Sequence, residues 1–198
     1  MRIVLASSSI RRQEILNNMN IKFEVVPADI EEKIDICEKM EHNAIKIANQ
    51  KAIDVCKKQK DDVLVIAADT IVCFENEILG KPKNEDEAKQ MLIRQQDKTI
   101  SVYTGMCIIV KCNGQTKKYL DLSKCEVIFD KMDNRQIEEY VKTKEPLDKA
   151  GAFAIQGIGA KYIKEIKGDF YAGVGLSINK LYTILLDIKK DTGIDLNI

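Results

Sequence analysis

A carboxylate lies within the most apolar run of the chain. Residues Val63–Val72 read VLVIAADTIV, and their Val and Ile content predicts a strand that is buried on both faces. Asp69 falls inside this strand, where a charged carboxylate without a partner is costly. Asp69 is therefore expected to pair with a cation, hold a metal ion or carry chemistry. The alternative, from this stretch alone, is a strand-end Asp that caps a neighbouring turn.

Two arginines follow a run of serines near the N-terminus. A short apolar strand over residues 2–6 leads into Ser7–Ser9, and the spacing of apolar residues predicts a helix over Arg11–Met19. Arg11 and Arg12 occupy its first turn, where the helix dipole favours anions over cations. This arrangement indicates a phosphate cradle made of hydroxyls, free backbone N–H groups and guanidinium groups. The alternative is that both arginines lie on a solvated face.

An acidic loop and a lysine add to these candidates. Residues 29–32 follow a strand predicted over 22–27, and their three carboxylates could hold a divalent metal through oxygen atoms. Such a run is also common in solvated loops. Lys51 lies beside the apolar stripe of a long helix predicted over 41–58. Its side chain either extends along the core or directs its ammonium group into a pocket.

Charge and hydropathy exclude several classes of protein. The 31 basic and 31 acidic residues balance, which argues against a general nucleic-acid coat or a polybasic membrane anchor. No apolar run approaches the roughly 20 residues that a membrane span needs. The start, MRIVLASSSIRR, has too short an apolar core for a signal peptide. We therefore expect a cytoplasmic protein without a membrane or nucleic-acid polymer as partner.

Cysteine and histidine chemistry is not indicated. The six cysteines form no CxxC pair and stand mostly inside apolar segments, which is typical of buried, reduced thiols rather than of a disulfide frame or a zinc site. A single histidine, His42, cannot build an HExxH zinc site, and nothing supports a serine triad around it. Hydrolytic chemistry would then depend on carboxylates, lysines and an oxygen-bound metal.

Helices and strands alternate in the first half of the chain, and paired strands follow in the second. Asn84 with Glu87, and Asp133 with Gln136, have the spacing of helix-capping residues. The elements predicted after Val72 are a short extended piece at 76–79, a helix to about 94, strands at 102–111 and 117–129 with an Asn113–Gly114 turn between them, a helix from 133 to about 143, a loop and strand hairpin over 145–168, and a helix over 177–189. This order predicts an α/β architecture with a mixed sheet, and the length of 198 residues fits one domain over residues 1–198.

Several sequence blocks stand in the order that one known family has. They are LASSSIRRQEIL at Leu5–Leu16, ADT at Ala68–Thr70, GKP at Gly80–Pro82, EPLDKAGAFAIQGIG at Glu145–Gly159, and GDF with VGLS at Gly168–Phe170 and Val174–Ser177. In this order they resemble the Maf family of nucleotide pyrophosphatases, which share their fold with the inosine-triphosphate pyrophosphatases. The resemblance covers nearly the whole chain, and it implies an elongated mixed sheet flanked by helices.

The resemblance also implies an activity, which is hydrolysis of a nucleoside triphosphate to the monophosphate and pyrophosphate with a divalent metal, Mg²⁺ or Mn²⁺. Asp69 corresponds to the family's catalytic carboxylate, a general base for the attacking water that also contacts the metal. Glu31 corresponds to its acidic partner near the metal. The triphosphate-binding positions match Ser7, Arg12, Lys51 and Lys81. Their basic groups would spread charge over the phosphates as the bond between the α and β phosphorus atoms breaks.

Substrate choice is implied in the same way. The branch of the family that acts on dTTP and UTP carries Arg, Thr and Gln at its specificity positions, and here these are Arg11, Thr70 and Gln156. The branch that acts on 7-methyl-GTP has an aromatic residue and an acid in place of the Arg and the Gln. The amide of Gln156 can donate and accept hydrogen bonds at once, which suits the edge of uracil or thymine. CTP and modified pyrimidine nucleotides are further candidate substrates.

Some positions depart from the family pattern. Ile10 replaces a proline, so the turn before the first helix loses a preset φ angle. Ser101 stands where many members have His or Gln, and Ser177 replaces the proline of the last block. None of these changes removes a proposed catalytic group. They bear on affinity and substrate range rather than on the reaction.

Two other functions compete with a pyrophosphatase. The family is also associated with septum formation and cell-division arrest, so a non-enzymatic, nucleotide-binding regulator is the main alternative. Asp69 favours the enzyme, because a sensor would need the cations Lys51 and Lys81 but no base. A phosphatase of another class would release orthophosphate instead. The family's usual oligomeric state is a homodimer.

Overall fold

A computed structural model gives the fold and describes residues 1–35, 37–194 and 196. The strands are β1 (Arg2–Leu5), β2 (Glu24–Val25), β3 (Val63–Phe74), β4 (Glu77–Ile78), β5 (Thr99–Cys112), β6 (Gln115–Phe129) and β7 (Ile163–Gly168). Their order in the sheet is β2-β1-β3-β5-β6-β7, and β4 pairs with β3. Strand β1 runs parallel to β2 and β3, whereas β4 and β7 run antiparallel to their neighbours. The mixed sheet expected from the sequence is confirmed.

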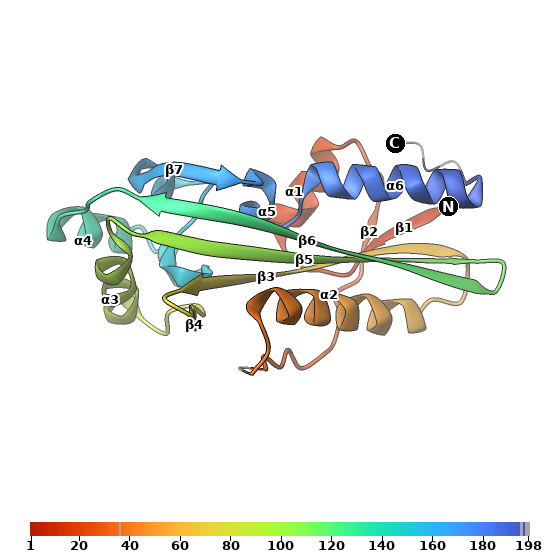
Figure 1. Ribbon diagram of the computed structural model, residues 1–198, viewed down its shortest axis with the longest axis horizontal. Helices are drawn as coiled ribbons and strands as arrows, with labels where there is room; N and C mark the ends of the chain where they lie inside the picture. Colours follow the sequence, from red (N-terminus) through yellow and green to blue (C-terminus); the bar gives the residue numbers. More distant parts are fainter. Residues whose placement is uncertain (36, 195, 197–198) are drawn as a thin grey trace. The chain divides into compact units, whose positions relative to one another are not determined.

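Helices fill most of the remaining chain (Figure 1). The α-helices are α1 (Ile10–Asn18), α2 (Met40–Lys57), α3 (Glu85–Gln95), α4 (Asn134–Lys142), α5 (Phe170–Val174) and α6 (Ile178–Thr192). The 3₁₀ helices are η1 (Glu145–Asp148), η2 (Ala150–Ala152) and η3 (Ile158–Tyr162). Among the described residues, no helix is long and apolar enough to span a membrane.

The chain divides into two compact units. Unit 1 comprises residues 1–70, 104–123 and 175–198, and unit 2 comprises residues 71–103 and 124–174. Strands β3, β5 and β6 each contribute residues to both units, so the chain passes from one unit to the other without a linker. One domain over residues 1–198 stays a prediction.

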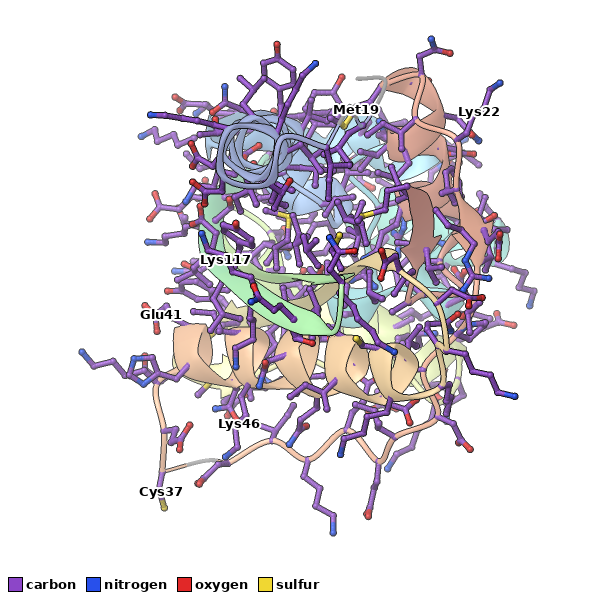
Figure 2. The ribbon with its side chains drawn as sticks, turned by 90° about the vertical axis from the view of Figure 1, so that its right-hand side faces the viewer. Met19, Lys22, Cys37, Glu41, Lys46 and Lys117 are labelled. Carbon is purple, nitrogen blue, oxygen red and sulfur yellow. The ribbon has the colours of Figure 1, made fainter. Side chains whose placement is uncertain are left out.

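Unit 1 is layered. Figures 1 and 2 show α2 on one face of its strands and α1 and α6 on the other. Helix α2 packs on the sheet through small residues: Ala44, Ala48 and Ala52 are all fully buried. A Cβ atom added at Gly105 of β5 would lie 2.3 Å from the backbone carbon of Ala44. The helix therefore approaches the strand more closely than any side chain at position 105 permits.

Unit 2 has its own core. Apolar residues of β5 and β6 pack with those of α3 and α4, and the rings of Phe129 and Phe153 meet edge to face with centroids 5.0 Å apart. Both predicted caps are present: Asn84 accepts a hydrogen bond from the backbone N–H of Glu87, and Asp133 and Gln136 form a reciprocal capping box. These caps fix where α3 and α4 begin.

The turn between β5 and β6 follows the prediction. Asn113 and Gly114 have φ angles of 50° and 75°, so both central residues of the turn lie in the left-handed region. This conformation is the type I′ turn that an Asn-Gly pair favours between antiparallel strands. The tight connection aligns the two longest strands of the sheet.

The prediction for residues 145–168 is wrong in part. Strand β7 forms at Ile163–Gly168, but three short 3₁₀ helices precede it in place of a second hairpin strand. Pro146 has no N–H to donate to a ladder, and Gly151 and Gly157 have φ angles of 73° and 135°. The predicted strand at 22–27 is likewise reduced to the two residues of β2.

Candidate active site

Lys51 and Asp69 form a nearly buried ion pair in unit 1. The ammonium Nζ of Lys51 lies 2.7 Å from Oδ1 of Asp69 and 2.8 Å from Oε1 of Glu32. The side chains of Lys51 and Asp69 are only 12% and 10% exposed, whereas that of Glu32 is 51% exposed. Helix α2 supplies the lysine and strand β3 the aspartate. The sequence left open whether Lys51 extends along the core or directs its ammonium group into a pocket, and in the structure the ammonium contacts two carboxylates.

The acidic loop contributes a residue that sequence reasoning did not single out. Glu31 pairs with Lys33 at 3.0 Å, and its side chain is 77% exposed. Glu32 instead contacts Lys51, the same ammonium that Asp69 contacts. A loop without periodicity gives no sequence signal for which of two adjacent acids faces the core. The structure thus brings Glu32, rather than Glu31, to Lys51.

Arg12 is the centre of a second polar cluster in unit 1. Its Nε donates to the carbonyl oxygen of Gly175 at 2.9 Å, one terminal nitrogen donates to Oγ of Ser7 at 3.0 Å, and the other donates to Oγ1 of Thr70 at 3.2 Å. Thr70 Oγ1 also lies 2.9 Å from Oγ1 of Thr104 on β5. Three residues predicted for the site, Ser7, Arg12 and Thr70, are thereby joined directly.

Burial shapes the electrostatics of this cluster. Desolvation lowers the pKa of Arg12 from its ordinary value, while the nearby negative charge of Asp69 acts in the opposite direction. The guanidinium remains a cation at neutral pH, because the ordinary pKa of arginine is so high. Arg12 therefore brings a fixed positive charge close to the carboxylate of Asp69.

The start of α1 keeps donors available. Ser9 occupies the N-cap position, but its side chain makes no capping hydrogen bond. Its backbone N–H donates to Oγ of Ser7 at 3.2 Å. Arg11 is half-buried in the first turn, and Ile10 is exposed at the position of the family proline. The first-turn N–H groups and the cations beside them fit the phosphate cradle expected from the sequence.

Lys81 and Gln156 belong to unit 2, and both are exposed. The loop that carries Lys81 is held by its backbone: the carbonyl of Gly80 accepts a hydrogen bond from the N–H of Gly151 at 3.0 Å. The carbonyl of Gly151 in turn accepts one from the buried side chain of Gln95 at 2.8 Å. Gln95 is thus a support for this loop that the sequence alone did not reveal.

The carboxylates around Lys51 fit a divalent metal by their chemistry. Asp69 and Glu32 converge on one cationic group, and oxygen donors of this kind suit Mg²⁺ or Mn²⁺. Within the described part of the chain, no group of three or more His, Cys, Asp or Glu residues could hold a metal ion. Water and substrate phosphate oxygens would then complete the coordination, which is common for Mg²⁺.

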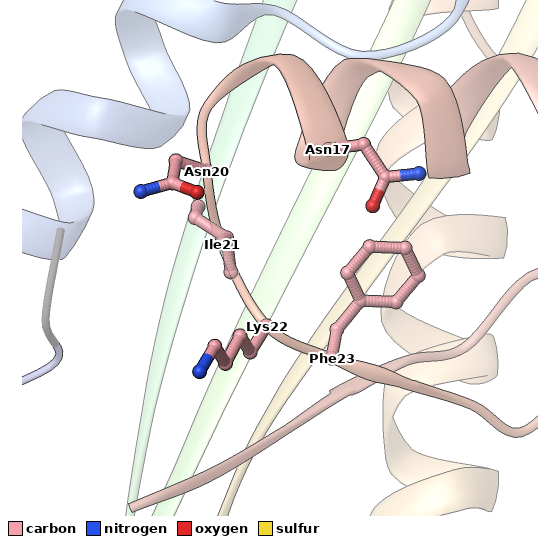
Figure 3. A pocket seen from close by; sticks show the side chains of 5 residues that line it. All are labelled: Asn17, Asn20, Ile21, Lys22 and Phe23. Atoms are coloured by element: carbon pink, nitrogen blue, oxygen red, sulfur yellow. The ribbon is translucent and has the colours of Figure 1, made fainter.

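A separate pocket in unit 1 does not belong to this site. This pocket has a volume of about 320 Å³ and is lined by Asn17, Asn20, Ile21, Lys22 and Phe23, whose side chains are drawn in Figure 3. It lies where α1 ends, and the carbonyl end of a helix carries a negative partial charge that disfavours phosphate. None of the predicted site residues lines it.

Buried thiols are not candidates for the chemistry. Cys56, Cys73, Cys107 and Cys125 are buried free cysteines, as expected from the sequence, whereas Cys112 is half-buried and Cys37 is exposed. Burial raises the pKa of Cys107 to about 12 and that of Cys125 to about 11. Because the thiolate is the reactive form, these residues are poor nucleophiles near neutral pH.

Known proteins resemble this chain over nearly its whole length. The family model described as "Maf-like protein" matches residues 2–188. A dTTP/UTP pyrophosphatase of Clostridium botulinum (strain Eklund 17B / Type B) is 43% identical over 189 residues, which cover 93% of this chain and 98% of the relative. A dTTP/UTP pyrophosphatase of Caldicellulosiruptor bescii is 44% identical over 194 residues, 96% of each chain.

The fold also has a counterpart among solved structures. The structure of a HAM1 protein from Coxiella burnetii matches with a TM-score of 0.51 and covers 94% of this chain and 99% of that one. The sequence identity is only 16%, so this match concerns the fold alone. It agrees with the α/β class and the mixed sheet expected from the sequence.

Proposed function

Because the chain belongs to the Maf-like protein family, we propose that it is a nucleoside triphosphate pyrophosphatase that hydrolyses dTTP and UTP to the monophosphate and pyrophosphate. The observation that carries the proposal is the nearly buried Asp69, held at 2.7 Å by Lys51. The relatives from Clostridium botulinum and Caldicellulosiruptor bescii, which are named dTTP/UTP pyrophosphatases, support it at 43% and 44% identity.

Asp69 has the properties of a general base for the attacking water. A carboxylate offers about four lone-pair positions, and the ammonium of Lys51 is bound through Oδ1. The carboxylate can therefore accept a proton from water while Lys51 holds its orientation. Strand β3 keeps the residue in place, since its neighbours Ala67 and Ala68 are fully buried. A fixed base of this kind typically contributes about 10²–10⁴-fold to the rate.

Cations of unit 1 would bind the triphosphate. Arg12 uses three N–H donors for Gly175, Ser7 and Thr70, so two of the five donors of a guanidinium stay available for phosphate oxygens. Lys51 adds a second positive charge, and we propose that Lys81 of unit 2 adds a third. Charge that develops on the pyrophosphate leaving group would be stabilised by these groups, which are positioned before substrate binds.

A divalent cation, when bound, would neutralise phosphate charge and polarise the phosphorus–oxygen bonds. The carboxylates that would hold it are Asp69 and Glu32, by the chemistry of their oxygen donors. Glu31, the ligand expected from the family resemblance, stays a prediction. Substitution of Glu32 and of Glu31 by Gln, with metal titration of each variant, would identify the ligand.

Base selection is proposed to depend on the residues that match the pyrimidine branch. Arg11 and Thr70 belong to unit 1, and Gln156 belongs to unit 2. Thr70 has two roles in this proposal: it helps to select the base, and its hydroxyl accepts a hydrogen bond from Arg12. CTP and modified pyrimidine nucleotides are included in the proposed range of substrates.

The proposed oligomeric state is a homodimer. Analytical ultracentrifugation would test it.

Product analysis of wild type and Asp69→Asn tests the function. Wild type should convert UTP and dTTP to the monophosphate and pyrophosphate with Mg²⁺ or Mn²⁺, as followed by phosphorus NMR. Asp69→Asn should lose about 10²–10⁴-fold in turnover and keep nucleotide binding. Asp191→Asn is the matched control, because Asp191 also pairs with a lysine, Lys117, but its side chain is 40% exposed. Near-normal turnover by Asp69→Asn would refute the assigned role.

The same assay separates the alternatives. Release of orthophosphate would indicate a phosphatase of another class. Binding of UTP without any product would favour the nucleotide-binding regulator of cell division. A panel of triphosphates run with both metals would then rank the substrates.

A further inference from the structure

Glu145 is a carboxylate of unit 2 that the proposed mechanism does not use. Its Oε2 accepts a hydrogen bond from the backbone N–H of Ile158 at 2.8 Å. Its Oε1 accepts one from the backbone N–H of Gly159 at 2.9 Å and another from the hydroxyl of Tyr140 at 2.8 Å. One side chain thus binds the backbone of two residues that lie 13 and 14 positions later in the chain.

Tyr140 extends this contact to the other end of the loop. Its hydroxyl accepts a hydrogen bond from the backbone N–H of Ala154 at 3.2 Å while it donates to Glu145. The segment 154–159 is therefore anchored at both ends by one connected pair of side chains. Gln156, the residue proposed to recognise the base, lies exposed between the anchors.

Glycines let the loop approach the anchoring groups. A Cβ atom at Gly157 would lie 2.3 Å from Oε2 of Glu145, and one at Gly159 would lie 2.3 Å from the hydroxyl oxygen of Tyr140. Gly157 also has a φ angle of 135°, which residues with a side chain rarely adopt. The loop backbone is thus shaped around the carboxylate and the phenol.

The hydrogen bonds to Glu145 require a side chain that accepts at both of its terminal atoms and donates at neither. The three groups that hydrogen-bond to Glu145 are all donors, namely two backbone N–H groups and a hydroxyl, and the positive charge of Lys149 also acts on it. Burial acts to raise the pKa of Glu145, but the hydrogen bonds from Gly159, Ile158 and Tyr140 outweigh it and hold the pKa below its ordinary value. An amide at this position would direct an NH₂ group at one of the N–H donors.

We infer that Glu145 is a positioning residue for Gln156, which fixes the loop 154–159 so that the amide of Gln156 is presented in one orientation for hydrogen bonding to a pyrimidine base. This inference rests on the proposed function, because it specifies how the base of that substrate is selected. A loop held before the substrate arrives loses less freedom on binding, so recognition is stronger.

Glu145→Gln tests the inference through base preference. The ratio of kcat/KM for UTP to kcat/KM for GTP should fall about 10- to 100-fold, mainly through a higher KM for UTP, since small misplacement of a contacting group costs this much. A fault in folding would lower the rates for both nucleotides together and leave the ratio unchanged. Glu165→Gln is the matched control, because Glu165 is an exposed carboxylate of unit 2 on β7. That control should keep the wild-type ratio.

Tyr140→Phe provides a second variant. It removes the anchor at Ala154 and one donor to Glu145 but leaves the two backbone contacts of the carboxylate. The ratio should fall in the same direction and by less than in Glu145→Gln. An unchanged ratio in both variants would overturn the inference.

Binding measured without turnover keeps the test separate from the proposed activity. Calorimetry with UTP and with GTP in the Asp69→Asn background gives the ratio of the two dissociation constants, and Glu145→Gln should reduce it in that background too. If the wild-type protein did not hydrolyse UTP, the proposed function would be refuted. If Glu145→Gln left the ratio of dissociation constants unchanged, only the role of Glu145 would be refuted. Hydrogen exchange should also speed up at the amides of Ile158 and Gly159 in Glu145→Gln, and unaltered exchange would contradict the anchoring itself.

Discussion

Replacement of Lys51 by Met should destabilise the protein strongly, although lysine is usually a surface residue that contributes little to the free energy of unfolding. The change keeps a long, flexible side chain on the inner side of α2 and removes the ammonium alone. It leaves Asp69 in β3 without the cation at 2.7 Å and Glu32 without the one at 2.8 Å. The affected charge is that of Asp69, because Glu32 can turn to solvent.

The magnitude follows from burial rather than from distance. Loss of one partner from a buried pair costs about 3–5 kcal/mol, and the remaining exposure of Lys51 and Asp69, 12% and 10%, lowers this to about 2–4 kcal/mol. Lys58 and Asp54 have the same separation of 2.7 Å, but their side chains are 47% and 21% exposed. Surface pairs of this kind contribute about 0–1 kcal/mol, so Lys58→Met should have a small effect.

Urea unfolding of wild type, Lys51→Met and Lys58→Met measures the difference between the two lysines. The double variant Lys51→Met with Asp69→Asn should recover at least half of the loss caused by Lys51→Met, because the buried charge that lost its lysine partner is then gone. If Lys51→Met lost no more stability than Lys58→Met, the pair would contribute no more than a surface contact. If the double variant recovered nothing, the loss would come from packing instead of charge.

Three further outcomes are expected. Gly105→Ala should cost about 3 kcal/mol in urea unfolding, because its Cβ would overlap the backbone of Ala44, while Gly80→Ala, with open space around its Cβ, should be nearly neutral. Gln156→Glu should lower kcat/KM for UTP and dTTP about tenfold or more relative to GTP, and an unchanged preference would refute its assignment. The pKa of Glu145 is lowered in the folded protein, so its stabilisation is fully present above its unfolded-state pKa of about 4.3 and is lost as pH falls through the folded pKa. The stability difference between wild type and Glu145→Gln should therefore shrink on acidification below about pH 4.

Elements with a strong local pattern could be predicted from the sequence. The apolar run of β3, the alanine stripe of α2 and the Asn113–Gly114 turn all occur as expected. Each depends on residues within a few positions of one another, through strand burial, helical spacing or turn conformation. Residues 145–168 could not be predicted in this way, because side chains such as Glu145 take the backbone N–H groups that a strand would have used.

The residues proposed for the site could be singled out in the sequence because they break a local rule. Asp69 is a charge inside a buried strand, and Arg11 and Arg12 are cations at the wrong end of a helix dipole. The loop after β2 breaks no such rule, so nothing local distinguished Glu31 from Glu32. That distinction came only from the position of Lys51, some twenty residues further along the chain.

The residues that hold the proposed site residues in place are harder to predict from the sequence, and the reason is physical. Arg12 is fixed by the carbonyl of Gly175, which is 163 residues away, and the loop around Gln156 is fixed by an ordinary Glu–Tyr pair. Both anchors work through backbone groups, and every residue type except proline offers the same backbone donors and acceptors. The type of residue that supplies the backbone group therefore cannot be predicted from the sequence, except where a glycine such as Gly157 is needed to make room. A glycine required beside a half-buried carboxylate is thus the local sign by which a positioning residue of this kind can be sought.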